Sequence, residues 1–143
     1  MVDGRNGLEA DRPVSHSEGK TMDKAQPAGA SVLHLDATKG EAFRPGFERW
    51  TIHTDKLMAV VIDIADGPWK EADPPHTHPH EQVAYVAEGE ILFLAEGLAP
   101  QLLAAGDLYA IPPNIPHAIQ LLSATARLVD CFTPVREDIL KQS

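Results

Sequence analysis

The chain has 143 residues, of which 43% are hydrophobic, and its formal net charge is −9. This length suits one domain with a buried core, and an acidic chain without a basic cluster argues against nucleic acid or an anionic membrane as a partner. No stretch approaches the roughly 20 apolar residues of a membrane-spanning helix, and the N-terminus lacks the apolar core of a secretory signal. The single cysteine, Cys131, excludes an internal disulfide. We therefore expect a cytoplasmic enzyme or binding protein.

Residues 1–30 differ in composition from the rest. They are rich in Gly, Ser, Asp, Lys and Pro and have no hydrophobic period, so they cannot bury enough apolar area to offset the entropy lost on ordering. The sequence predicts a flexible N-terminal arm over residues 1–30 and one folded domain over residues 31–143.

From residue 31 onward, short β-rich runs alternate with turn residues such as Glu88-Gly89, Glu96-Gly97 and Gly106-Asp107. The predicted strands are Phe47–His53, Leu57–Ile64, Gln82–Ala87, Glu90–Ala95, Leu108–Ile111, His117–Leu122 and Ala126–Phe132. Many short strands with Gly and Pro between them predict an all-β sandwich or barrel. Only the end of the chain has a helical pattern, with Thr133 as N-cap and Pro134 as the first residue of a short helix.

Three histidines are crowded together in "PPHTHPHEQVAYVAEGE", residues 74–90. Side chains two positions apart on a strand point the same way, so His76, His78, His80 and Gln82 are candidates for one face. The interspersed prolines cannot donate ladder hydrogen bonds, which places this segment at a sheet edge or entry. A histidine pair at this spacing offers two nitrogens to one metal ion, and a third ligand must come from elsewhere.

A third ligand candidate is His117, which follows the turn "IPPNIP" (residues 111–116) and opens another apolar run. A single histidine in such a place is more often packed and hydrogen-bonded in a core. Beside a pair with strand spacing, it predicts a three-histidine site for one divalent ion, Zn, Ni, Fe, Mn or Co. The alternative is that the three imidazoles are ordinary surface and core residues.

With these residues the sequence resembles a cupin. The first cupin motif has two histidines, an acidic residue and a glycine, and the second has a glycine, a proline, another glycine and a histidine. The matching positions are His76, His78, Gln82 and Gly89, followed by Gly106, Pro112, Asn114 and His117. The resemblance implies a double-stranded β-helix, a jelly-roll-like barrel that usually pairs into homodimers and holds its metal inside.

Two positions depart from the cupin pattern. Asn114 replaces the usual Gly, a mild change because Asn tolerates left-handed backbone angles. Gln82 replaces the usual Glu, and as a ligand it would supply a neutral amide oxygen. A divalent ion would then keep its full charge and attract an anionic substrate more strongly. Alternatively, Gln82 only hydrogen-bonds a ligand, and His80 and Glu81 compete with it, although the motif spacing favours Gln82.

The last predicted strand has an acidic residue among apolar ones, because Leu128, Asp130 and Phe132 share one face. A buried Asp is costly without a partner, and one interpretation is an ion pair with Arg136. The functional interpretation makes Asp130 a general acid or base, Phe132 a wall against a sugar ring, and Arg136 a two-pronged ligand for a substrate carboxylate. The plainer alternatives are a core Phe132 and a solvated Arg136.

The tail Asp130-x-Phe132-x-x-x-Arg136, taken with the histidine-rich segment, is similar to the KdgF-type cupins of pectin and alginate breakdown. This narrower resemblance implies conversion of 4,5-unsaturated uronate monosaccharides to linear ketouronates, with a small anionic sugar acid as the substrate. The alternatives are an Fe(II)-dependent dioxygenase and a non-catalytic module that binds a sugar acid or a metal. Carbon–sulfur lyases of the same superfamily are disfavoured because their usual acidic ligand is Glu.

Overall fold

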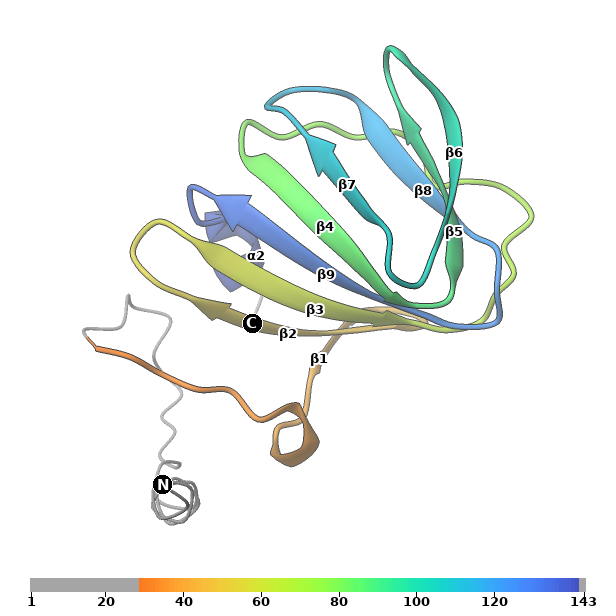
Figure 1. Ribbon diagram of the computed structural model, residues 1–143. Helices are drawn as coiled ribbons and strands as arrows, with labels where there is room; N and C mark the ends of the chain where they lie inside the picture. The colour runs from red at the N-terminus through yellow and green to blue at the C-terminus, as the bar shows by residue number, and fades with distance from the viewer. Residues whose placement is uncertain (1–28, 142–143) are drawn as a thin grey trace, which may run out of the picture. The chain divides into compact units, whose positions relative to one another are not determined.

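The computed structural model describes residues 29–141, in which nine strands form two antiparallel sheets (Figure 1). The larger sheet has the order β1 (Glu41–Arg44), β2 (Phe47–His53), β3 (Met58–Ile64), β9 (Ala126–Thr133), β4 (Glu81–Glu88) and β7 (Leu108–Ile111). The smaller sheet has the order β6 (Leu98–Ala104), β5 (Glu90–Ala95) and β8 (His117–Leu121). A 3-10 turn at Leu35–Ala37 precedes β1, and helix α2 (Glu137–Lys141) follows β9. The predicted arm falls largely on residues 1–28, which lie outside the described residues.

All seven predicted strands are present, each with ends within one residue of the prediction. Two strands were missed. β1 has only four residues and an irregular register with β2, and β6 contains Pro100 and is almost wholly exposed. Pro is tolerated in β6 because this strand lies at the edge of the smaller sheet. The all-β, jelly-roll-like fold expected from the sequence is confirmed.

A hydrophobic core lies between the two sheets. It contains Val86 and Leu128 from the larger sheet and Ile91 and Leu121 from the smaller one. Burial alternates strictly along β9, as the two-residue period of a strand requires. The inner positions of β9 therefore run from Ala126 through Leu128 and Asp130 to Phe132, and they line the interior of the barrel.

A second cluster joins α2 to the barrel. Met58, Val60 and Phe132 pack there against Val135 and Ile139. The apolar side of this short helix thus covers the part of the barrel interior that holds Phe132, next to the inner row of Asp130.

The helix begins three residues later than the sequence predicted. Thr133 still belongs to β9, where it pairs with Glu81, and its hydroxyl donates to the carbonyl of Lys56 at 2.7 Å. Since Thr133 is held by strand pairing, it cannot cap the helix, and α2 starts only at Glu137. No helix within residues 29–141 combines the length and the apolar character needed to cross a membrane.

Candidate metal centre and its cavity

Backbone hydrogen bonds join the two histidine-bearing segments, which lie far apart in the sequence. The amide of His76 donates to the carbonyl of His117 at 3.0 Å, and the amide of His117 donates back to His76 at 3.0 Å. The amide of Asn114 donates to the carbonyl of His78 at 2.8 Å. Asn114 has φ 64°, the left-handed angle that the sequence allowed for this position. The three histidines are therefore brought side by side by the main chain itself.

The three predicted histidines form one cluster. Their ligand nitrogens all lie within 4.8 Å of one another, and no other such cluster occurs among residues 29–141. The Nδ1 atom of His78 faces the carbonyl of His80 at 3.1 Å, and Nδ1 of His117 faces the carbonyl of Ile115 at 2.8 Å. A carbonyl can only accept, so both rings carry their proton on Nδ1 and present an Nε2 lone pair.

Two of the three histidines have a lowered pKa, which favours their neutral form. Burial lowers the pKa of His117, although its hydrogen bond to Ile115 partly opposes the shift. Burial lowers the pKa of His76 as well, with further lowering from His78 and Arg136. Neutral imidazoles are the form that binds metal.

Gln82 joins this cluster from the inner face of β4. Its Oε1 lies 3.0 Å from Nε2 of His78. Because the ring proton of His78 is on Nδ1, its Nε2 and the Oε1 of Gln82 are both acceptors and cannot hydrogen-bond to each other. A cation between them would interact favourably with both atoms. A donor set of three neutral imidazoles and one amide oxygen fits a divalent transition ion.

The competing ligand candidates lie elsewhere. The ring centroid of His80 is 5.6 Å from that of His78, and His80 is not part of the ligand cluster. Its carbonyl, rather than its ring, serves the site by accepting from His78. Glu81 is exposed and starts β4 on the outer side.

Asp130 is buried beside Gln82, with only 6% of its surface exposed. Burial raises its pKa from 3.8 to about 7, against lowering effects from a side-chain hydrogen bond with Gln82 and from the charge of Arg136. Its Oδ1 atom is fully buried and has no hydrogen-bond partner among the described residues. A carboxyl group that titrates near neutrality is suited to exchange protons with a ligand.

Arg136 does not form the ion pair with Asp130 that one interpretation of the sequence proposed. It donates to both carboxylate oxygens of Asp138, through Nε at 3.2 Å and Nη2 at 2.6 Å. Its guanidinium carbon lies 5.0 Å from the ring centroid of Phe132. Phe132 in turn meets the ring of His78 edge-on at 5.7 Å. Both residues thus flank the histidine cluster, and both line the same cavity.

This cavity, of about 300 Å³, contains all the predicted site residues except His78 in its lining. It also contains polar residues to which the sequence assigned no role, among them Arg44, Arg49, Asp73 and Tyr109. The inward direction of Arg49 could have been predicted from the sequence, because Arg49 lies two residues after Phe47 and therefore on the same face of the strand. The other three depend on which strands and loops the fold brings together.

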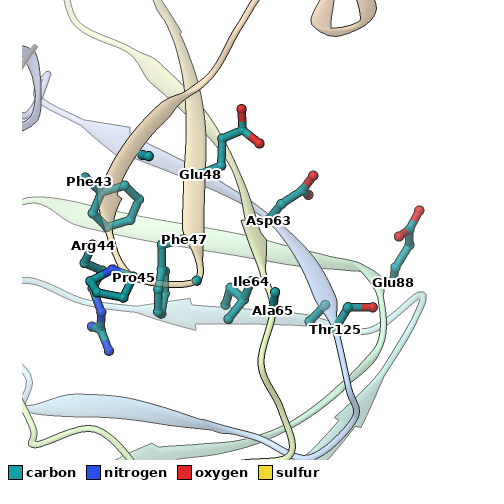
Figure 2. A pocket seen from close by; sticks show the side chains of 13 residues that line it. Phe43, Arg44, Pro45, Phe47, Glu48, Asp63, Ile64, Ala65, Glu88 and Thr125 are labelled. Atoms are coloured by element: carbon teal, nitrogen blue, oxygen red, sulfur yellow. The ribbon is translucent and has the colours of Figure 1, made fainter.

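A larger hollow of about 680 Å³ opens at the turn between β1 and β2 (Figure 2). The carboxylates of Glu48, Asp63 and Glu88 are spread along it and do not converge. Asp63 is already engaged by Arg127 through two hydrogen bonds, at 2.6 and 2.8 Å. This groove contains no histidine, so the smaller cavity, where the polar groups do converge, is the better candidate for chemistry.

Comparisons with known proteins agree with this geometry. Residues 67–132 match the family described as "Cupin domain". The "Pectin degradation protein KdgF" of Dickeya dadantii is 36% identical over 107 residues, which make up 73% of this chain and 94% of that protein. The solved structure of KdgF from Halomonas sp. matches with a TM-score of 0.69 and 30% identity, over 76% of this chain and 99% of that chain.

A shorter similarity links the chain to dimethylsulfoniopropionate lyase DddQ of Ruegeria pomeroyi. The two are 37% identical over 65 residues, which make up 46% of this chain but only 31% of the lyase. The similarity to KdgF therefore covers more of this chain and nearly all of the relative, whereas the similarity to the lyase covers less than half of either protein.

Proposed function

The chain belongs to the cupin family and resembles KdgF, and on this premise we propose that it is a metal-dependent enzyme of uronate metabolism in pectin degradation. The reaction we propose converts a 4,5-unsaturated uronate monosaccharide to a linear ketouronate by ring opening and tautomerisation. The observation that carries the proposal is the buried carboxyl of Asp130, whose Oδ1 lacks a partner among the described residues and which lines the same cavity as His76 and His117.

The metal site of this proposal consists of His76, His78, His117 and Gln82. When bound there, a divalent ion supplies Lewis-acid polarisation of a substrate oxygen. All four ligands are neutral, so the protein does not cancel the charge of the ion. Gln82 has a second role, because its amide also reaches Asp130. It would thereby connect the ion-binding residues to the acid.

The charge of the cavity supports an anionic substrate. Three arginines and three aspartates line it, and the raised pKa of Asp130 keeps a large fraction of that residue uncharged near pH 7. The lining is therefore neutral to positive before any ion is added, although the whole chain carries −9. A small sugar acid fits both this charge and a cavity at the lower end of the usual range for small-molecule sites, about 300–1,000 Å³.

Asp130 is the proposed proton carrier. As a carboxylate it takes the proton of the anomeric hydroxyl while the bond between carbon 1 and the ring oxygen breaks, which leaves an aldehyde at carbon 1 and an enolate oxygen on carbon 5. The enolate then takes a proton at carbon 4 and Asp130 releases the proton it took, so carbon 5 becomes a ketone and the carboxylate is restored. No atoms are gained or lost overall and no oxidant is needed.

Phe132 and Arg136 complete the proposed machinery. Phe132 provides an apolar wall next to His78 against which a sugar ring can pack. Arg136 adds a positive charge beside that wall. To bind a substrate carboxylate through two hydrogen bonds, Arg136 would have to break its two hydrogen bonds to Asp138. The charge acts on an incoming anion even while Asp138 stays in place.

The proposal is tested by following the ultraviolet absorbance of the carbon 4–carbon 5 double bond in an unsaturated uronate. We expect the absorbance to fall with metal-loaded protein and not with chelated protein, and NMR to identify the linear keto product. An unchanged spectrum with fully metal-loaded protein would refute the proposed reaction. Chelated protein reloaded with the same ion is the matched control.

Two alternatives predict different observations. An Fe(II)-dependent dioxygenase would consume oxygen and would lose activity when iron is replaced by zinc, and neither is expected of the ring-opening reaction. A non-catalytic binding module would bind a uronate tightly without forming any product. The same NMR experiment, run with and without oxygen, separates all three.

We also propose that the chain forms a homodimer. The outer face of the larger sheet carries exposed Val83, Tyr85 and Leu108, and Tyr85 pairs directly with Leu108 across β4 and β7. Exposed apolar patches of this kind are typical of protein contacts. A second copy offers the same patch, so these three residues bring no charge into the contact.

A further inference from the structure

The cavity contains a buried cation whose role the proposed reaction does not yet explain. Arg49 lies on the inner face of β2, opposite Ile62 of β3, and is only 6% exposed. A guanidinium remains charged at every physiological pH, and burying such a charge is costly unless anionic groups surround it. A buried positive charge in the lining of this cavity attracts an anionic ligand.

Two neighbours from β1 hold the guanidinium of Arg49 in place. Its Nε donates to Oε1 of Glu41 at 3.1 Å, and its guanidinium carbon lies 4.1 Å from the ring centroid of Phe43. Stacking on an aromatic ring fixes the plane of the guanidinium, and Phe43 itself lines the cavity. The group is thus oriented before any ligand arrives, which lowers the entropy that binding would cost.

The three arginines of the cavity differ in their exposure to water. The side chain of Arg44 is 46% exposed, that of Arg136 is 18% exposed, and that of Arg49 is 7% exposed. Attraction between charges is strongest where water is excluded.

Arg49 is also at a suitable separation from the proposed reacting groups. Asp130 pairs with Val60 of β3, and Val60 pairs with Thr51 of β2, so Arg49 lies two strands across and two residues along the sheet. With about 4.8 Å between strands and about 3.4 Å per residue, the two Cα atoms are about 12 Å apart on a flat sheet. Both side chains enter the same cavity, and the space between them suits one small molecule.

We propose that Arg49 is the carboxylate-binding subsite of this cavity. It holds the acid group of a sugar acid at the β2 side, while the anomeric end faces Asp130 and the histidines. Arg136 then keeps its contacts with Asp138 and contributes charge only. This inference rests on the proposed function in one respect, since it names the residue that recognises the anionic end of the proposed substrate class.

The test compares a uronate with its uncharged methyl ester. A saturated uronate and its ester are titrated into metal-loaded protein, with binding followed by calorimetry, and the unsaturated pair is used for kcat and KM. Loss of a hydrogen-bonded pair with a charged group lowers affinity by about 10- to 100-fold. We expect Arg49→Gln to show this loss for the acid and little change for the ester, so that the preference for the acid disappears. Arg49→Lys keeps the charge without the planar fork, and we expect an intermediate loss.

Glu41→Gln is the matched control for a purely structural role. If Arg49 served only to dock β1 onto β2, then Glu41→Gln and Arg49→Gln would have the same effect on stability and on ligand binding. We expect Glu41→Gln to lower the unfolding temperature and to keep the preference for the acid over the ester. Arg49→Lys replaces Arg49→Gln in every comparison if the latter does not fold.

The outcomes separate this inference from the proposed reaction. A preference for the acid that persists in Arg49→Gln and disappears in Arg136→Gln would overturn the subsite, even if the enzyme opens unsaturated uronates. A wild-type protein that turns over no uronate but binds the saturated acid through Arg49 would support the subsite and refute the reaction.

Discussion

Replacing Asp130 by Asn is expected to stabilise the metal-free protein at alkaline pH while it destroys activity. Burial raises the pKa of Asp130 from 3.8 to about 7, a shift of about 3 units, and each unit is worth 1.36 kcal/mol. The folded state therefore holds this proton more tightly than the unfolded state by about 4 kcal/mol. The sign follows from linkage: this contribution to stability is fully present below pH 3.8 and is lost as the pH rises toward about 7.

The magnitude at two convenient pH values follows from the same shift. At pH 5, about 1 pH unit above the pKa of the unfolded chain, the unfolded chain has already released the proton. About 3 kcal/mol of the stabilisation by this proton therefore remains at pH 5 and is lost between pH 5 and pH 8. Asn has no proton to lose. The difference in unfolding free energy between Asp130→Asn and the wild type should thus shift by about 2–3 kcal/mol in favour of the variant over this interval.

Urea unfolding of chelated protein at pH 5 and pH 8, followed by tryptophan fluorescence, measures this difference. Titration of the histidines is common to both proteins and cancels in the comparison. A stability difference that is equal at the two pH values would refute the reasoning. Turnover of the metal-loaded variant should fall by about 10²–10⁴-fold, as is typical when one positioned acid or base is removed. Full turnover by Asp130→Asn would exclude it from the chemistry.

The remaining predictions concern the metal, the substrate, the dimer and the core. His117→Ala should weaken Zn or Ni binding by at least about 100-fold, because losing only a hydrogen-bond partner of a metal ligand already lowers metal affinity by about 10–100-fold. Calorimetry measures the metal affinity, and an unchanged affinity would contradict the metal site. Gln82→Glu should tighten metal binding but raise KM for a uronate by at least about fivefold, since one added negative charge costs ~1 kcal/mol even in water. Tyr85→Lys should convert the dimer to a monomer in light scattering after gel filtration, with activity retained. Leu121→Ala should lower the unfolding free energy by about 2–5 kcal/mol in urea titrations.

The strands and the identity of the ligand-bearing segments could be predicted from the sequence because their causes are local. The two-residue period of Ala126–Phe132 and the Glu88-Gly89 turn depend on neighbours along the chain, and each of the seven predicted strands is present. The helix start was wrong because pairing between Thr133 and Glu81 extends β9, and such pairing is a long-range contact. β6 was missed because its Pro100 is acceptable only at an edge, and a sequence does not show which strand lies at an edge.

The sequence by itself determined the chemical groups of the site: three imidazoles, an amide and a carboxyl on apolar strands. Only the tertiary structure decided their surroundings. Burial by neighbouring strands raises the pKa of Asp130 to about 7. Arg136 pairs with Asp138 instead of Asp130. Arg49 reaches the cavity from β2, two strands away from β9 in the larger sheet. The physical reason is that residue spacing determines the side of a strand to which a group points, whereas desolvation and charge pairing depend on which other strands fold against it.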